Sequence, residues 1–115
     1  MAGQKTISVT SWPPPAIPVP PPPPPPPPDY IVTGNIIPVA TGNYFEDGIY
    51  NGVMSYKLSG FNWFIWKNTV PPIWELSSAK GSQQQASSWL GGGNIIGNYS
   101  PQQPHSGTAV VSAGH

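Results

Sequence analysis

The chain has 115 residues, and only 7% of them are charged, with four Lys and Arg against four Asp and Glu. Soluble domains usually carry about a quarter charged residues, so this surface has no basic patch for nucleic acid and little repulsion between copies. The chain has no cysteine, which excludes disulfides and thiolate metal sites. This composition is typical of a chain that works inside an assembly.

Residues 1–12 form the first of three predicted segments. Apolar and polar side chains alternate at residues 6–10, which predicts a short anchoring strand that pairs with a sheet edge. No apolar region of the kind found in signal peptides follows Met1. No stretch approaches the roughly 18 apolar residues of a membrane span, so no membrane partner is expected.

Residues 13–28 form the second segment and hold 13 of the 18 prolines, with an unbroken run at positions 20–28. Proline fixes φ and lacks the N–H donor, so neither a helix nor a sheet ladder can form. We predict a semi-rigid polyproline II arm of about 50 Å, at ~3.1 Å per residue. One interpretation of this arm is a spacer, and the alternative is low-complexity disorder. Pro20, Pro24 and Pro28 are the predicted contact positions on this arm.

Residues 29–115 form the third segment, in which short apolar stretches alternate with turn residues. This pattern predicts an all-β domain, either a small antiparallel sandwich or a barrel-like sheet. Residues 36–39 predict a short edge strand, because a proline within it cannot donate to a ladder.

Two turn dipeptides lie close together in this domain. Asn51-Gly52 stands between two apolar stretches and is the strongest hairpin signal, typical of a type I′ turn. Asp47-Gly48 predicts a second tight turn, with the Glu46 and Asp47 carboxylates at its solvated tip.

Residues 61–66 are the most distinctive stretch of the domain, because four of the six are aromatic. Such a composition predicts a strand. Side chains alternate between two faces, and both faces are apolar here, with Trp63 and Ile65 on one and Phe64 and Trp66 on the other. The strand is therefore predicted to lie centrally, and its outer face must be covered by a loop, an arm or another subunit.

The last third of the chain predicts further strands at residues 73–77, 94–101 and 108–112. Residues 79–88 are rich in Gln and Ser and predict an exposed loop, and residues 91–93 are three glycines that predict a flexible hinge. Gly-Asn-Tyr occurs at residues 42–44 and again at residues 97–99, each time close to an Ile-Ile pair. This echo indicates that the first and last strands lie side by side and close the sheet.

No catalytic or metal-binding pattern is present. His105 and His115 are the only imidazoles and lie in the C-terminal part, away from any cluster of carboxylates in the sequence. The serines lie outside any Gly-x-Ser-x-Gly motif, and no Gly-Lys-Ser/Thr follows the glycines. We therefore predict a protein that is not an enzyme and holds no cofactor.

The aromatic side chains have two interpretations. Trp63 and Trp74 are predicted to fill the core, whereas Trp12 and Trp89, which flank flexible segments, suit an interface as well as a core. Other aromatic residues could stack sugars or line a groove for polyproline. The predicted interface residues of the chain, apart from the arm prolines, are Trp12, Tyr30, Trp66 and Trp89.

The order of the motifs resembles a small β module of phage and virus structural proteins, over about residues 31–111. The matching positions are Gly42, Tyr44, Tyr50, Gly52, Tyr56, residues 64–66, residues 74–76 and residues 95–101. The resemblance implies a virion part such as a head fibre, a cement protein or a fibre tip. The proline arm lies outside the module.

The sequence therefore predicts a virion structural protein, a capsid decoration or head or tail fibre component made in the host cytoplasm. It would assemble through its proline arm and aromatic-rich domain as a homo-oligomer, with a trimer favoured, on a capsid or tail, without nucleic acid. One alternative is a fibre-tip module that binds receptor glycans. The other is an adaptor whose proline run is a ligand for aromatic grooves.

Overall fold

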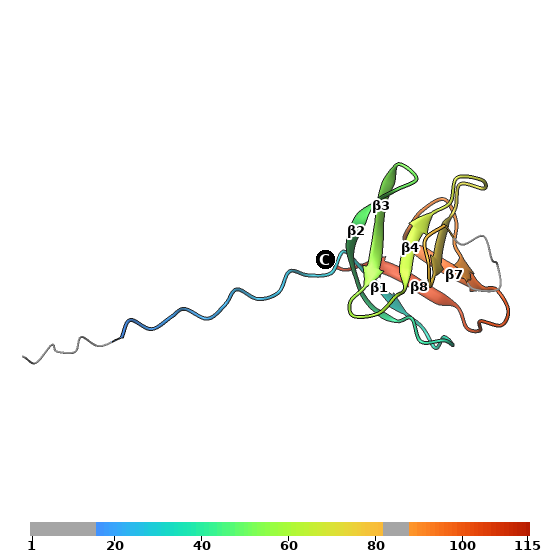
Figure 1. Cartoon of the computed structure of the whole chain (residues 1–115). Helices are drawn as coiled ribbons and strands as arrows, with labels where there is room; N and C mark the ends of the chain where they lie inside the picture. Colours follow the sequence, from blue (N-terminus) through green and yellow to red (C-terminus); the bar gives the residue numbers. More distant parts are fainter. Residues whose placement is uncertain (1–15, 82–87) are drawn as a thin grey trace, which may run out of the picture.

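The computed structural model describes residues 16–81 and 88–115, and the described domain is a closed barrel of antiparallel strands (Figure 1). Each strand pairs with the next along the chain, and the last strand pairs with the first. The prediction of an all-β domain is confirmed, and the sheet closes as a barrel. The strands are β1 (Tyr30–Thr33), β2 (Gly42–Tyr50), β3 (Val53–Leu58), β4 (Phe64–Lys67), β5 (Trp74–Ser77), β6 (Ser88–Leu90), β7 (Gly97–Pro101) and β8 (Ala109–Ala113).

The closure between β1 and β8 confirms the prediction that the first and last strands lie side by side. Tyr30 pairs with Ala113, and Val32 pairs with Val111. A closed sheet has no free edge, which removes the row of unpaired N–H and C=O groups at which sheets associate. Contact with another copy must therefore come from side chains, loops or the arm rather than from strand addition to the described sheet.

The inside of the barrel is filled by apolar side chains from every strand and from the segment between β1 and β2. Trp63 and Trp74 pack against this core and are partly buried, as predicted. Trp89 belongs to the core and is fully buried. The core comprises Val32, Ile36, Ala40, Tyr44, Leu58, Ile65, Leu76, Trp89, Tyr99, Ala109 and Val111.

The hairpin between β2 and β3 confirms one turn prediction and corrects the other. Asn51 and Gly52 have φ angles of 52° and 82°, and positive φ at both central residues is what a type I′ turn requires. Asp47 and Gly48, however, lie within β2, where the register shifts between Glu46 and Ile49. The glycine with positive φ accommodates a β-bulge here instead of a turn.

The aromatic strand is shorter than predicted, because β4 begins at Phe64 while Phe61 lies in the preceding turn and is 66% exposed. The prediction that both faces are buried is confirmed. Ile65 points into the core, and Trp66 points to the outside of the barrel, yet both side chains are fully buried.

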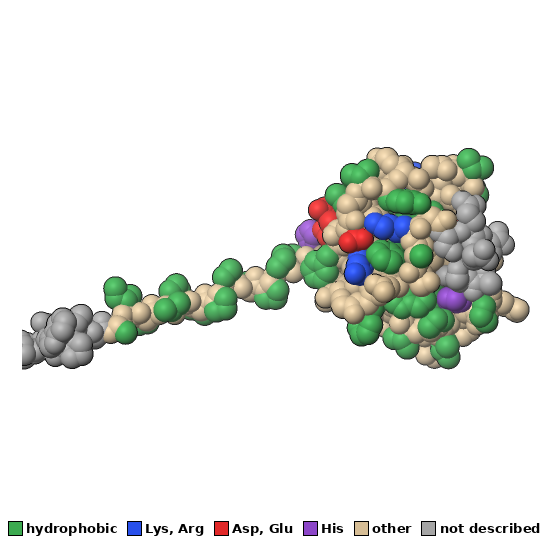
Figure 2. Space-filling model, viewed as in Figure 1, with side chains coloured by type: hydrophobic (Ala, Val, Ile, Leu, Met, Phe, Trp, Pro, Cys, Tyr) green, Lys and Arg blue, Asp and Glu red, His purple; other side chains and the backbone are tan. Residues whose placement is uncertain are grey.

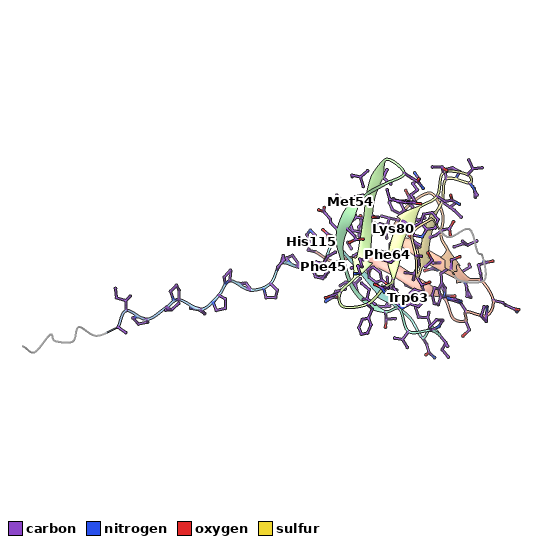
Figure 3. The ribbon with its side chains drawn as sticks, in the orientation of Figure 1. Phe45, Met54, Trp63, Phe64, Lys80 and His115 are labelled. Atoms are coloured by element: carbon purple, nitrogen blue, oxygen red, sulfur yellow. The ribbon has the colours of Figure 1, made fainter. Side chains whose placement is uncertain are left out.

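The chain itself covers the outer face of β4, in what we call the outer cluster: Tyr50, Phe64, Trp66, Ser77 and Lys80. Trp66 Nε1 donates to Ser77 Oγ at 2.8 Å, and the Trp66 ring meets the Tyr50 ring edge-on at 5.8 Å between centroids. The Lys80 ammonium lies over the Phe64 ring, 5.5 Å from its centroid (Figure 3). Of the three predicted covers, a loop of the same chain is the one observed.

Lys80 fixes this loop to the bulge in β2. Its ammonium lies 3.1 Å from Asp47 Oδ2 and donates to Ser55 Oγ at 3.0 Å. Lys80 and Gly81 are half-buried, so the predicted exposed loop at residues 79–88 is not exposed at this point. Residues 82–87 of that loop lie outside the described residues.

The repeated Gly-Asn-Tyr sequence has a structural counterpart in two tyrosines that bond to their own chain four residues back. The Tyr44 hydroxyl donates to the Ala40 carbonyl and the Tyr99 hydroxyl donates to the Ile95 carbonyl, both at 2.6 Å. Burial raises the pKa of both hydroxyls, so they remain protonated donors. Each bond satisfies a carbonyl group where the chain enters a strand.

Two further predictions are corrected. Residues 36–39 contribute a single bridge, between Ile37 and Ser106, in place of an edge strand. The predicted glycine hinge is part of the barrel, because the Gly91 N–H donates to the Trp74 carbonyl at 2.8 Å. The Trp74 N–H in turn donates to the Gly92 carbonyl at 2.9 Å, so these glycines continue the β5–β6 ladder.

The described part of the arm, residues 16–28, leads away from the barrel and contains no helix or strand (Figure 1). Its side chains are exposed up to position 27, and only Pro28 is half-buried. The polyproline II conformation stays a prediction. The predicted strand at residues 6–10 lies outside the described residues, as does Trp12.

Candidate functional site

The point where the arm joins the barrel, which we call the arm root, consists of Pro28 and Asp29 and is held from both sides. The Asp29 N–H donates to the Tyr44 carbonyl at 3.0 Å, and the Gly114 N–H donates to the Asp29 carbonyl at 3.1 Å. His115 Nδ1 lies 2.8 Å from the Pro28 carbonyl oxygen, where its N–H donates. A Cβ on Gly114 would collide with that same carbonyl oxygen, so the chain passes very close here.

The Asp29 side chain makes a further contact with the neighbouring strand. Its Oδ2 accepts a hydrogen bond from the Glu46 backbone N–H at 3.0 Å. The arm therefore leaves the barrel from a fixed position between β2 and the residues that follow β8. Figure 2 shows charged side chains close to this point, on a face where most other side chains are uncharged.

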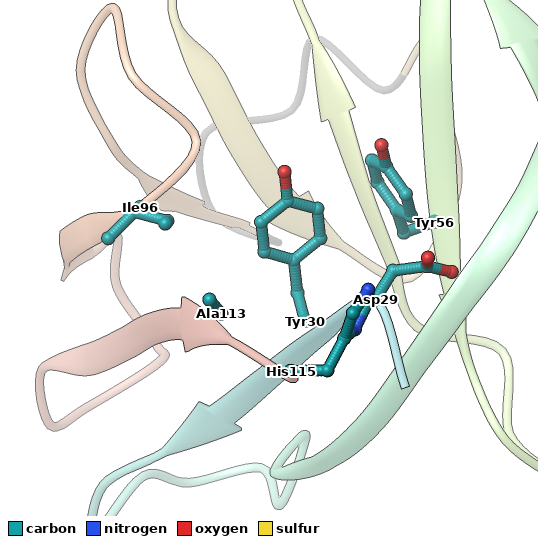
Figure 4. Close-up of a pocket in the computed structure, with 6 residues that line it drawn as sticks. All are labelled: Asp29, Tyr30, Tyr56, Ile96, Ala113 and His115. Atoms are coloured by element: carbon teal, nitrogen blue, oxygen red, sulfur yellow. The ribbon is translucent and has the colours of Figure 1, made fainter. Parts of the chain in front are cut away.

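A pocket of about 290 Å³ opens directly beside the arm root, at the mouth of the barrel (Figure 4). Strand register places Tyr30 and Tyr56 on the inner face of the barrel, since Tyr30 lies opposite Tyr44 and Tyr56 lies opposite Ile65. Barrel mouths are a common place for ligand sites. The barrel-mouth pocket is lined by Asp29, Tyr30, Tyr56, Ile96, Ala113 and His115.

The two tyrosines form the aromatic wall of the pocket. Their ring centroids are 4.8 Å apart and the rings meet at 77°, an edge-to-face arrangement. Burial, together with the adjacent Tyr30 hydroxyl and the Asp29 and Glu46 carboxylates, raises the pKa of Tyr56 to about 12. The Tyr56 hydroxyl is therefore a hydrogen-bond donor throughout the neutral range.

The polar groups that line the pocket are the Tyr30 and Tyr56 hydroxyls, the Asp29 carboxylate and the His115 imidazole. Among the described residues, no group of three or more His, Asp or Glu side chains could hold a metal ion. The same part of the chain contains no helix long and apolar enough to cross a membrane.

The predicted interface residues separate into two groups. Tyr30 lines the pocket, and the Pro28 carbonyl bonds to His115, which also lines it. Pro20 and Pro24 are exposed on the arm. Trp66 and Trp89 are fully buried within the single chain, so no exposed surface supports an interface role for either.

Sequence reasoning missed most of the pocket. Asp29, Ala113 and His115 come together only when β8 closes on β1, and none of the three belongs to a sequence motif. The sequence indicates Tyr56 only as a matching position of the virion module and not as a binding residue. The sole signal was the predicted pairing of the first and last strands, which brings Tyr30 and Ala113 together.

Comparisons with family models, curated proteins and solved structures gave no match to this chain.

One buried carboxylate lies away from the pocket, and it makes stability depend on pH. Glu75 is 5% exposed, and burial raises its pKa, while a hydrogen bond from the Asn68 amide opposes that shift. A raised pKa means that the folded state holds the proton more tightly than the unfolded state. The stability contributed by protonated Glu75 is therefore complete below the ordinary pKa of 4.5 and lost as the pH rises through the raised value.

Glu75→Gln is expected to remove this pH dependence, because a neutral side chain keeps the Asn68 contact without ionising. Urea denaturation between acidic and neutral pH should show wild-type stability falling as pH rises and a flatter profile for Glu75→Gln, with the variant the more stable at neutral pH. Glu46→Gln, on an exposed side chain, is the matched control. Parallel profiles for wild type and Glu75→Gln would contradict the prediction.

Proposed function

We propose that the chain is a virion structural protein, a decoration or fibre component of a capsid or tail, which assembles as a homo-oligomer through its arm. The observation that carries the proposal is the arm: residues 16–27 are exposed, and no surface of their own barrel covers them. An apolar segment of this kind, with Ile17 and Val19 nearly 90% exposed, favours a partner surface.

The barrel supports the same role. It is small, closed and held by one continuous core, so it can serve as a rigid block whose attachment point is the arm root. The chain carries no net charge and few charged residues, which favours close packing between copies. The motif order resembles that of virion modules, and a trimer with its arms about one axis is the assembly we favour.

Deletion of residues 1–28 is expected to leave a folded barrel that no longer assembles. The described core contains no residue before Val32, so removal of the arm takes away no core contact. Circular dichroism melts should stay close to those of the full chain, while sedimentation should show a loss of the oligomer. If the truncated chain unfolds, the arm is part of the domain and the proposal is wrong.

A second variant separates a stiff arm from a simple tether. Replacing residues 21–26 by a Gly/Ser linker of equal length keeps the connection but removes the ring contacts and the stiffness. We expect assembly to weaken. Unchanged assembly would mean that the arm acts only as a spacer.

The two alternatives remain distinct predictions. A glycan-binding fibre tip would use the barrel-mouth pocket, and a glycan array should then give hits that depend on Tyr30. An adaptor would instead present the proline run to foreign aromatic grooves and would itself stay monomeric.

A further inference from the structure

We propose that the barrel-mouth pocket of one copy receives the proline run of a neighbouring copy. The inference rests on the proposed assembly and names its contact: the tyrosine pair Tyr30 and Tyr56 against prolines of the run at positions 20–28.

The pocket adjoins the arm root and shares Asp29 with it. Asp29 lines the pocket, and His115, which also lines it, bonds to the Pro28 carbonyl. When several copies place their arms around one axis, each arm root lies near that axis, and so does each pocket. A neighbour's proline run then passes the mouth of the adjacent barrel.

The pocket's own arm is poorly placed to fill it. The bonds from Gly114 and His115 fix the direction in which the chain leaves the mouth. The proline run ends at Pro28, directly beside the barrel. Such a run is too stiff to fold back into the pocket of its own barrel within a few residues. The occupant must therefore come from a second copy.

The hydrogen-bonding groups of the pocket complement a proline run. Prolines offer ring faces and carbonyl acceptors but no N–H donors, so their receptor must supply the donors. Tyr56 carries its proton throughout the neutral range, and Tyr30 lies beside it. The Asp29 carboxylate already accepts the Glu46 N–H, so an uncharged segment over it does not leave that charge without a partner.

The ordering cost is also small. A polyproline II segment is stiff before it binds, so it loses little conformational entropy when it is fixed on aromatic rings. Each copy would give one arm and receive one, a heterologous contact that closes as a ring in a trimer. This arrangement covers both the exposed arm and the open mouth of every barrel.

A cysteine scan in the full chain tests the contact directly, because the native chain has no cysteine. Ile96→Cys places a thiol at the pocket, where Ile96 is 51% exposed. It is mixed in turn with single arm variants from Pro21→Cys to Pro27→Cys and oxidised, and mixed disulfides are counted by mass spectrometry. Bridging requires the two Cα atoms to approach within about 7 Å.

The expected result is a mixed-disulfide yield that repeats every third arm position, because polyproline II has three residues per turn. The best positions should exceed by severalfold the yield obtained with Val70→Cys, a control that is 82% exposed but does not line the pocket. Yields equal to the control at every arm position would overturn the inference.

A second measurement examines the tyrosine hydroxyl. Tyr56→Phe removes one donor and should weaken each arm contact by roughly 2- to 12-fold, the equivalent of one hydrogen bond, so the oligomer should dissociate at a higher concentration. Tyr50→Phe, in the outer cluster, is the matched control and should change nothing. An unchanged dissociation concentration for Tyr56→Phe would count against the contact.

The outcomes separate this inference from the proposed function. A stable oligomer without the periodic cross-link, or with a pocket that still binds a saccharide, overturns the arm contact and leaves the assembly role in place. A chain that stays monomeric at all concentrations overturns both.

Discussion

Trp66→Ala should lower the free energy of unfolding by about 3–5 kcal/mol, the range for removal of a large buried aromatic side chain. Trp66 is fully buried although it lies outside the barrel, so its loss leaves a cavity between β4 and the loop that carries Lys80. The variant also leaves Ser77 Oγ without its indole donor, while that hydroxyl still donates to the Ala79 carbonyl at 2.8 Å.

Phe61→Ala is the matched control for this experiment. Phe61 precedes the same strand, yet it is 66% exposed, so its replacement should change stability by no more than about 0.5 kcal/mol. Urea denaturation gives both values when unfolding is followed by the circular dichroism of the backbone, which does not rely on the tryptophan that is removed. A folded, fully stable Trp66→Ala chain that fails to oligomerise would show that Trp66 contacts a partner.

The aromatic strand shows which part of the fold can be predicted from the local sequence. Two apolar faces at residues 61–66 were enough to predict burial on both sides, and Ile65 and Trp66 have it. The identity of the outer cover was beyond prediction, because Lys80 reaches Asp47 across 33 residues of sequence. This contact between Lys80 and Asp47 forms only in the final arrangement of the strands.

The bulge in β2 marks a limit of turn dipeptides. Asn51-Gly52 and Asp47-Gly48 are both turn dipeptides, and both glycines have positive φ. The chain turns at Asn51-Gly52, where the hairpin pairs Tyr44 with Leu58 on the adjacent strand. Asp47-Gly48 instead adds one extra residue to β2 as a bulge. Pairing along the whole strand outweighs the local preference.

The candidate site depends on closure of the barrel, which explains why so little of it could be predicted. Tyr30 and Tyr56 come from strands that do not pair, and Ile96 and His115 come from the far end of the sequence. Their meeting requires the β1–β8 register, in which Tyr30 faces Ala113. The arm was evident from composition, but its relation to a pocket was not.

The repeated tyrosine unit supports the second large prediction. Tyr99→Ala should lower the free energy of unfolding by about 3–5 kcal/mol, because it removes a fully buried aromatic ring. The Tyr99 ring packs directly against the backbone of Gly91. A Cβ added to Gly91 would lie only 2.8 Å from the Tyr99 ring carbon Cζ. The glycine is therefore part of the packing of this ring, and the loss of the ring leaves a void against the backbone.

Tyr99→Phe divides this effect between the ring and the hydroxyl. Phenylalanine keeps the ring but leaves the Ile95 carbonyl without its 2.6 Å bond, which should cost about 1–3 kcal/mol. Tyr44→Phe should cost a similar amount, because its hydroxyl makes the same bond to the Ala40 carbonyl. Urea denaturation of the three variants tests the repeat as a structural unit. If Tyr99→Phe is as stable as wild type, water replaces the hydroxyl at that carbonyl, and the echo in the sequence reflects ring packing alone.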